Sequence, residues 1–312
     1  MHTITTISPV IAMILMGYLL RRNNIFSGST VKELSFLVYW VGLPCLLFYK
    51  VSSTHFNFAA CGKIYFVLLT GLLFCILAAY TLTKVFAVPR ESVSAVVQSS
   101  FRGNLAFIGL PLLMYSISDT PAKIANSTQT MAVFLLALMV LTNNCVAVMI
   151  FLIHQHTINY KTIGKLSLGI VTNPLLISSA AGLIFGRFVD EMPVLLERIL
   201  SPFSQMVLPL ALISVGAAIA NQKIIHHFFP ALLASFIKLG VYPLFGYLIA
   251  RYVFFLPHEH MRLAMIFMAC PTAAASYILA NELGGDHTLT ATIIAICTVL
   301  SVIPLTTVIY FF

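Results

Sequence analysis

The first 50 residues of the chain are echoed about 165 residues further on. At this offset Pro9 recurs as Pro174, Gly17 as Gly182, Arg22 as Arg187 and Pro44 as Pro209. A second echo, at offset 168, pairs Val88-Pro89-Arg90-Glu91 with Leu256-Pro257-His258-Glu259. The sequence therefore predicts two similar halves, residues 1–155 and residues 163–312.

Composition decides the solvent in which these halves fold. Of 312 residues, 60% are hydrophobic and only 8% are charged, and the mean hydropathy is +1.00. Soluble domains carry roughly 25% charged residues, so a core in water cannot use this much apolar surface. A spanning helix needs ~20 apolar residues. The runs that meet this need are 4–20, 34–50, 62–86, 92–115, 128–153, 163–187, 201–220, 227–254, 261–281 and 288–311.

These ten runs are predicted to be transmembrane helices. Only helices and closed barrels satisfy backbone polar groups in hydrocarbon, and the runs are continuous rather than alternating. No basic segment precedes the first run, which we interpret as a retained span and not as a signal peptide. Two similar halves with five crossings each must lie upside down relative to each other. The prediction is therefore an all-α membrane protein of two inverted repeats of five helices.

The basic residues favour one orientation in the membrane. The net charge is +8, and the strongest cluster, Arg21, Arg22 and Lys32, lies between the first two spans. The positive-inside rule places this loop in the cytoplasm, so both termini are predicted to be extracytoplasmic. Because the charges lie in short loops, we interpret them as topology signals and expect no nucleic-acid partner.

Two predicted helices carry interruptions at equivalent positions. In the fourth span, Arg102, Gly103 and Asn104 fall at mid-membrane depth, where a charge costs ~2.5–3.5 kcal/mol and Gly weakens a helix by about 1 kcal/mol. In the ninth span, Pro271 lacks a backbone donor and clashes with the preceding turn. At offset 168 Gly103 falls on Pro271 and Asn104 on Thr272. Each break alone could be a packing kink, but matched breaks predict a binding site between inverted repeats.

The chemistry of these breaks favours an anion. A broken helix leaves unpaired N–H groups and about half a positive charge at the start of the next half-helix. Asn104 can donate through its amide, Thr272 and Ser276 through hydroxyls, and Arg102 adds a full positive charge. A small organic anion, most simply a carboxylate, fits these donors. The predicted substrate-binding residues are Gln98, Arg102, Gly103, Asn104, Asn144, Pro271, Thr272 and Ser276.

Lys238 lies inside the eighth span, five residues before Pro243. It could be a charge partner or a gating element, could satisfy carbonyls freed by the proline, or could extend to the membrane surface. None of the nine Asp and Glu residues falls inside the predicted spans. Proton-coupled pumps usually keep a carboxylate there, so its absence favours uniport of an anion driven outward by the membrane potential. Sodium coupling through hydroxyl and carbonyl oxygens stays open.

Other classes of protein find less support. The six cysteines form no C-x-x-C pair and the loop-edge histidines have no metal-site spacing, so we expect no metal and no cofactor. The sequence contains no H-E-x-x-H, no G-x-S-x-G and no Asp-rich prenyl-diphosphate motif, which disfavours an intramembrane enzyme. A membrane sensor that binds without transporting stays open as an alternative.

Three stretches also resemble a known family. The segment Ser100–Pro111 resembles the fourth-helix motif of the auxin efflux carrier family, Cys270–Pro304 resembles its last two helices, and Val41–Pro44 resembles its second helix. The family includes plant auxin exporters and bacterial permeases assigned to malate and related acids, and it is related in fold to bile-acid sodium symporters. The resemblance implies a scaffold of spans one, two, six and seven. It implies a mobile transport domain of spans three to five and eight to ten, with spans four and nine crossing at the substrate.

The resemblance carries over Asn104 and Pro271 as site residues and implies a bacterial inner-membrane location. Two departures bear on the substrate. The long cytoplasmic segment of the plant carriers is missing here, and they have a proline where this chain has Gly103 and an apolar residue where it has Arg102. We therefore expect a smaller and more strongly charged acid than auxin, with a sodium- or proton-coupled carboxylate or bile-acid-like symporter as the alternative. Homodimers are common in this class, so a homodimer is a further expectation.

Overall fold

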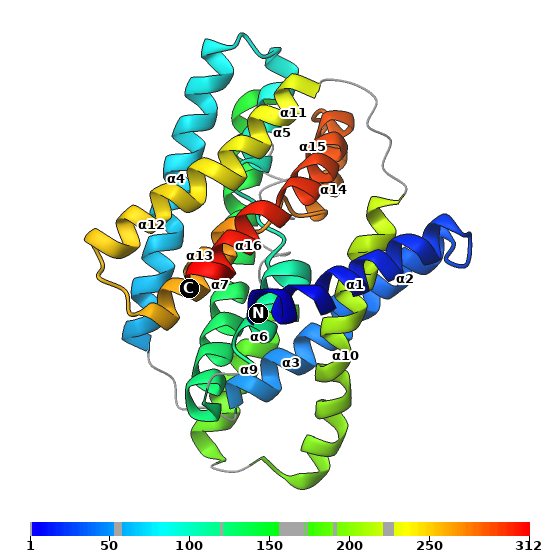
Figure 1. Ribbon diagram of the computed structural model, residues 1–312, viewed down its shortest axis with the longest axis vertical. Coiled ribbons are helices and arrows are strands. Elements are labelled where there is room, and N and C mark those ends of the chain that lie inside the picture. Colours follow the sequence, from blue (N-terminus) through cyan, green and yellow to red (C-terminus); the bar gives the residue numbers. More distant parts are fainter. Residues whose placement is uncertain are drawn as a thin grey trace. The chain divides into compact units, whose positions relative to one another are not determined.

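The computed structural model describes residues 2–52, 58–118, 121–155, 172, 174–189, 192–220 and 228–312 (Figure 1). This part of the chain is helical, with one isolated β-bridge and no strand. The predicted all-helical class is therefore confirmed there. Of the sixth predicted span, residues 163–171 and 173 lie outside the described residues.

Most predicted spans correspond to one helix or to consecutive helical pieces. Three short pieces, η1 to η3, are π-helical turns inside longer stretches. The helices are α1 (His2–Arg22), α2 (Gly28–Leu37), η1 (Val38–Gly42), α3 (Leu43–Ser52), α4 (Phe58–Val85), α5 (Arg90–Ser99), η2 (Leu105–Gly109), α6 (Leu110–Ser116), α7 (Ala122–Gln155), α9 (Pro174–Phe188), α10 (Val194–Ile219), α11 (Phe228–Phe236), η3 (Ile237–Val241), α12 (Tyr242–Tyr252), α13 (His258–Ala269), α14 (Ala275–Glu282), α15 (His287–Leu300) and α16 (Val302–Phe311).

Length and composition make this a multi-pass membrane protein. Within the described ranges, six helical stretches are long and apolar enough to cross a bilayer: Gly28–Ser52, Ala59–Val85, Ile124–Phe151, Val194–Ala218, Phe228–Tyr252 and His287–Phe311. Leu105–Ser116 and Ile177–Phe188 are shorter apolar helices. The count of ten spans and their inverted arrangement stay predictions.

The chain divides into two compact units. Unit 1 comprises Met1–Phe58, Ala106–Met139 and Ile163–Asn221, and unit 2 comprises Ala59–Leu105, Val140–Thr162 and Gln222–Phe312. The chain changes unit after Leu105, directly behind the predicted break of the fourth span, and again within α7. The predicted division into a scaffold and a transport domain stays a prediction.

Unit 1 is held together by close helix pairs. In this unit α1 packs along α10 and α3 packs along α9. A Cβ at Gly17 would overlap the backbone carbonyl of Ile213, and one at Gly182 would lie 3.0 Å from the carbonyl oxygen of Phe48. Small residues of this kind let membrane helices approach at backbone distance, where dispersion contacts accumulate.

Unit 2 contains most of the residues predicted for the site. Here α11 and α5 pack on α15, and α12 packs on α13 (Figure 1). The Tyr242 hydroxyl donates to the carbonyl of Leu68 at 3.0 Å, and the rings of Phe74 and Phe245 stack at 3.8 Å between centroids. These contacts fix α4 against α12.

Candidate functional site

Both predicted interruptions are present. Helix α5 ends at Ser99 and helical structure resumes only at Leu105, while α13 ends at Ala269 and α14 begins at Ala275. The causes are those expected from the sequence, because Gly103 costs helix stability and Pro271 has no N–H for the helical ladder. The predicted breaks in spans four and nine are therefore confirmed as features of the backbone.

The two breaks lie against each other inside unit 2. Gly103 and Thr272 form an antiparallel bridge. The backbone N–H of Asn104 donates to the carbonyl of Pro271 at 2.8 Å, and that of Ala273 donates to the carbonyl of Arg102 at 3.0 Å. Each break thus satisfies backbone groups that the other leaves free, which is the requirement for non-helical backbone at membrane depth.

Two of the predicted polar residues tie the segments together. The Thr272 hydroxyl donates to the carbonyl of Ser99, the last residue of α5, at 2.8 Å, and the Thr272 N–H points to Cys297 Sγ at 3.3 Å. The Gln98 side-chain amide donates to the carbonyl of Ser276 at 3.1 Å. These bonds join α5, α14 and α15 and restrict the geometry of the crossing.

Arg102 is almost completely buried, at 5% exposure. Its guanidinium donates from Nη1 to Gln98 Oε1 at 3.3 Å and from Nη2 to Asn144 Oδ1 at 2.7 Å. Both acceptors are neutral amide oxygens, and no carboxylate of the described chain forms an ion pair with it. Two predicted residues, Gln98 and Asn144, therefore hold the positive charge of a third, Arg102, without neutralising it.

Unpartnered polar groups surround this crossing. The Asn104 side chain is 8% exposed and forms no hydrogen bond within the described ranges. The hydroxyls of Ser99 and Ser276 and the Asn143 side-chain oxygen are buried without a partner. An unsatisfied buried group costs about 1–3 kcal/mol, so it needs an explanation such as water or a ligand. Sequence reasoning did not select Ser99 or Asn143, although each adjoins a selected residue.

Lys238 is fully buried on η3. Its Nζ donates to the carbonyl of Met268 at 2.7 Å and lies 4.7 Å from the centroid of the Tyr242 ring. That carbonyl is in the last turn of α13, where Pro271 ends the ladder, so the lysine also faces the negative end of the helix dipole. Two sequence-based interpretations are therefore wrong: Lys238 does not extend to the surface, and the carbonyl it satisfies is not one freed by Pro243.

The geometry of the described residues favours electrostatic binding of a charged molecule. In the part of the chain that the structure describes, no three His, Cys, Asp or Glu residues lie close enough to hold a metal ion. What unit 2 offers is two buried cations, paired helix ends and free amide and hydroxyl groups. Such a site can bind and release a charged guest without forming a covalent bond.

The comparisons with known proteins agree with this architecture. A family model described as a membrane transport protein matches residues 2–310, and no curated protein matches at a significant level. The matched family is the one that the motifs around Asn104 and Pro271 resemble. Because the match covers nearly every residue, the chain belongs to the membrane transport protein family of auxin efflux carriers.

Proposed function

We propose that the protein carries small organic anions, such as malate or related carboxylates, by alternating access. The observation that carries this proposal is the antiparallel pairing of the two helix breaks through Asn104, Pro271, Arg102 and Ala273. Broken helices that pair at their breaks leave the following half-helix N-termini, with their partial positive charge, beside a common point. A substrate there would be exposed to each side in turn as the transport domain moves against the scaffold.

The charge balance of unit 2 supports an anionic substrate. Arg102 and Lys238 are both buried, and within the described residues neither has a carboxylate partner. Charges interact far more strongly in a poorly solvated interior than in water. A bound carboxylate would supply the opposite charge that the chain itself leaves out. Arg102 is the closer candidate, since its two neutral partners, Gln98 and Asn144, are themselves predicted site residues.

The glycine contacts of unit 1 support the inverted repeat on which alternating access rests. Adding 165 converts Gly17 into Gly182 and Phe48 into Ile213, so the two glycine contacts of unit 1 interchange. The two backbone hydrogen bonds at the breaks interchange as they do in any antiparallel bridge, so they are compatible with the same symmetry. A pseudo-two-fold axis in the membrane plane would produce both relations.

The ends of unit 2 support the ten-span count. With ten spans, loops three, five and nine share one membrane face, and loop eight shares the other with the C-terminus. Glu91, His154 and Asp286, from loops three, five and nine, line one cavity. Arg262, just behind loop eight, donates from Nε to the carbonyl of Phe312 at 2.6 Å. Both groupings agree with the predicted topology, in which the first of these faces is cytoplasmic.

We infer export by uniport as the transport mode. All nine acidic residues lie outside the predicted spans, so the membrane core offers no carboxylate for a proton relay. One negative charge moving outward through 100 mV releases ~2.3 kcal/mol, enough for roughly a 50-fold gradient. The alternative is a sodium- or proton-coupled symporter of carboxylates or bile-acid-like molecules, with hydroxyl and carbonyl oxygens of the crossing as ion ligands.

The test is flux of labelled malate in proteoliposomes under an imposed potential. A hydrogen bond to a charged group contributes about 1.5–3 kcal/mol, so we expect Asn104→Ala to lower flux by roughly 10- to 150-fold. The matched control is Asn126→Ala, an exposed position on α7, which should leave flux unchanged. Equal flux in Asn104→Ala and wild type would remove the site assignment. Flux that requires a sodium or proton gradient would replace uniport, and saturable binding without flux would indicate a sensor.

A further inference from the structure

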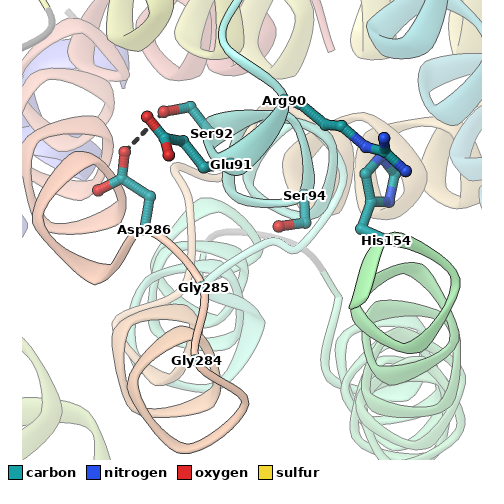
Figure 2. A pocket seen from close by; sticks show the side chains of 8 residues that line it. All are labelled: Arg90, Glu91, Ser92, Ser94, His154, Gly284, Gly285 and Asp286. Atoms are coloured by element: carbon teal, nitrogen blue, oxygen red, sulfur yellow. Dashed lines mark hydrogen bonds between the residues drawn. The ribbon is translucent and has the colours of Figure 1, made fainter. Parts of the chain in front are cut away.

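A polar cavity lies in unit 2 beside the first half of α5. Its volume is about 620 Å³, and it is lined by Arg90, Glu91, Ser92, Ser94, His154, Gly284, Gly285 and Asp286 (Figure 2). Ligand pockets typically measure ≈ 300–1,000 Å³, so a molecule of metabolite size fits. The deepest lining residue on α5 is Ser94, and Ser99, the last residue of the helix, lies about one and a half turns further along.

The cavity has two chemically different sides. In Figure 2, Arg90 and His154 lie together on one side, and Glu91, Ser92 and Asp286 lie on the other. The guanidinium of Arg90 favours an anion on its side. The other side presents two carboxylates, which favour a cation that can donate hydrogen bonds. A ligand that carries both charges on a short spacer satisfies both sides.

Hydrogen bonds and backbone geometry hold the lining residues in place. Asp286 caps α15 by accepting from the Leu289 N–H at 2.9 Å, and its other oxygen accepts from the Ser92 hydroxyl at 2.7 Å. Gly284 has a φ of 65°, and a Cβ at Gly285 would overlap the ring of Phe151, so this wall is bare backbone. These constraints keep the space between α5 and the α14–α15 turn open.

One buried group in the lining has no protein partner. The Ser94 side chain is 4% exposed, lines the cavity, and forms no hydrogen bond in the described part of the chain. In Figure 2 it lies between the two charged sides. Polar atoms of buried residues are normally satisfied, so a ligand oxygen or nitrogen in the cavity is a natural partner for this hydroxyl.

The surroundings of the cavity suit a lipid. Exposed apolar side chains lie near the lining residues in the chain: Val85 and Phe86 are five and four residues before Arg90, and Ile153 is next to His154. The His154 ring also stacks on Tyr80, with 5.5 Å between the centroids. A charged cavity bordered by exposed apolar side chains at the ends of membrane helices matches the boundary between headgroups and acyl chains.

We propose that this cavity binds a phosphoethanolamine group, with the phosphate against Arg90 and the ammonium against Glu91 and Asp286. The group belongs to an ethanolamine phospholipid, whose acyl chains would lie on the exposed apolar residues beside the cavity. A free phosphoethanolamine molecule presents the same chemistry. This site is separate from the proposed transport site and does not depend on the substrate or on flux.

The experiment measures lipid binding to the purified full chain by native mass spectrometry and by thermal shift. We expect dioleoyl-phosphatidylethanolamine to bind at least fivefold more tightly than the choline lipid, whose ammonium donates no hydrogen bond, and than the glycerol lipid, which has no cation. Glu91→Gln should remove this preference, and Arg90→Gln should weaken the binding of all three lipids, because they share the phosphate. Both side chains are exposed at a helix start, so neither substitution should disturb folding.

Matched controls are Lys84→Gln, also exposed at the end of α4, and Glu33→Gln, an exposed acid of unit 1; both should keep the preference. Free O-phosphoethanolamine added as a competitor separates the two sources. Displacement of the lipid, or binding of the free compound alone, upholds the shared chemistry and identifies which source is preferred. Equal binding of all three lipids, an unchanged preference in Glu91→Gln, or an unchanged affinity in Arg90→Gln overturns the proposal.

Discussion

The two units bury polar groups in different ways. In unit 1 most buried hydroxyls return to their own helix, as Ser179 does to the carbonyl of Leu175 and Ser204 to that of Leu200, and Thr130 also reaches the Lys50 carbonyl at 3.5 Å. Unit 2 has bonds within helices too, but its longest-range bonds join distant segments: Lys238 bonds Met268, which is 30 residues away, and Thr272 bonds Ser99, which is 173 residues away. A hydrogen bond inside one helix forms whatever the tertiary arrangement is. A hydrogen bond between distant segments forms only when the fold brings those segments together.

This difference suggests that unit 1 contributes mainly to stability and unit 2 mainly to substrate binding. Unit 1 gains its cohesion from backbone-distance packing, which tolerates no added side-chain volume but makes few demands on polarity. Unit 2 holds two buried cations and a set of unpartnered polar groups, which lower stability unless they serve a purpose. We therefore expect substitutions in unit 1 to act mainly on folding, and substitutions at the crossing in unit 2 to act mainly on transport.

The largest expected effect is on the folding of unit 1. Gly17→Leu places side-chain atoms where the Ile213 carbonyl lies, and overpacking of this kind costs about 3 kcal/mol or more. We expect little folded protein on size-exclusion chromatography, and a lower melting temperature for what remains. Gly62→Leu is the control, because nothing lies within 4 Å of a Cβ there. A wild-type melting temperature for Gly17→Leu would contradict the packing account of unit 1.

Next in size is the effect of the buried arginine on transport. Arg102→Gln removes the positive charge while keeping a polar side chain beside Gln98 and Asn144. Losing a charge-assisted contact to the substrate corresponds to roughly 10-fold or more in flux. Stability should change less, because the lost hydrogen bonds are offset by the removal of an unneutralised buried charge. Malate flux and melting temperature are measured on the same preparations.

The control for this substitution is Arg187→Gln, an exposed arginine of unit 1. It removes the same charge from the protein without touching the crossing. If the two variants transported malate equally well, Arg102 would have no role in substrate binding. If Arg102→Gln instead failed to fold while Arg187→Gln did not, the guanidinium would be a structural element and the contrast between the units would be weaker.

A smaller effect is expected at the buried lysine, where both properties change together. Lys238→Met keeps the length of the side chain but leaves the Met268 carbonyl without its donor, which costs about 1–3 kcal/mol. We expect a lower melting temperature, and flux that falls further than the folded fraction does, because the end of α13 supports the break at Pro271. Lys84→Met, at an exposed position, should change neither. Unchanged flux per folded molecule would make Lys238 a purely structural residue.

The sequence predicted the features that have local causes. Continuous apolar runs gave the helices, and the Gly103 and Pro271 breaks follow from backbone chemistry that any neighbour would experience. Partners were harder to predict, because they depend on how distant segments pack. Nothing near Thr272 in the chain indicates that its N–H faces Cys297, and Asp286 was readable only as a loop residue, although it caps α15 beside a cavity.

The partners of Lys238 and Arg102 also depend on how distant segments pack. The lysine precedes Pro243 by five residues, so a local carbonyl was one of the partners left open. The helical segment instead continues past Pro243, and the carbonyl that Lys238 satisfies belongs to α13. The charge of Arg102 and its predicted depth follow from the sequence, but only the fold shows that Gln98 and Asn144 hold its guanidinium. Local backbone chemistry predicts where a helix is interrupted, and packing decides which group then bonds the free backbone carbonyls and N–H groups.

The smallest expected effect concerns a single hydrogen bond across the crossing. Thr272→Val keeps the shape of the side chain but removes the donor to the Ser99 carbonyl, a change of about 1 kcal/mol in the free energy of unfolding. Thr272→Ser keeps the hydroxyl and should retain most of that stability, so the pair isolates the bond from the packing. Flux should fall severalfold in the valine variant, because this bond ties the end of α5 to the break before α14. A valine variant as active and as stable as the serine variant would mean that the backbone bridge between Gly103 and Thr272 holds the crossing without help from side chains.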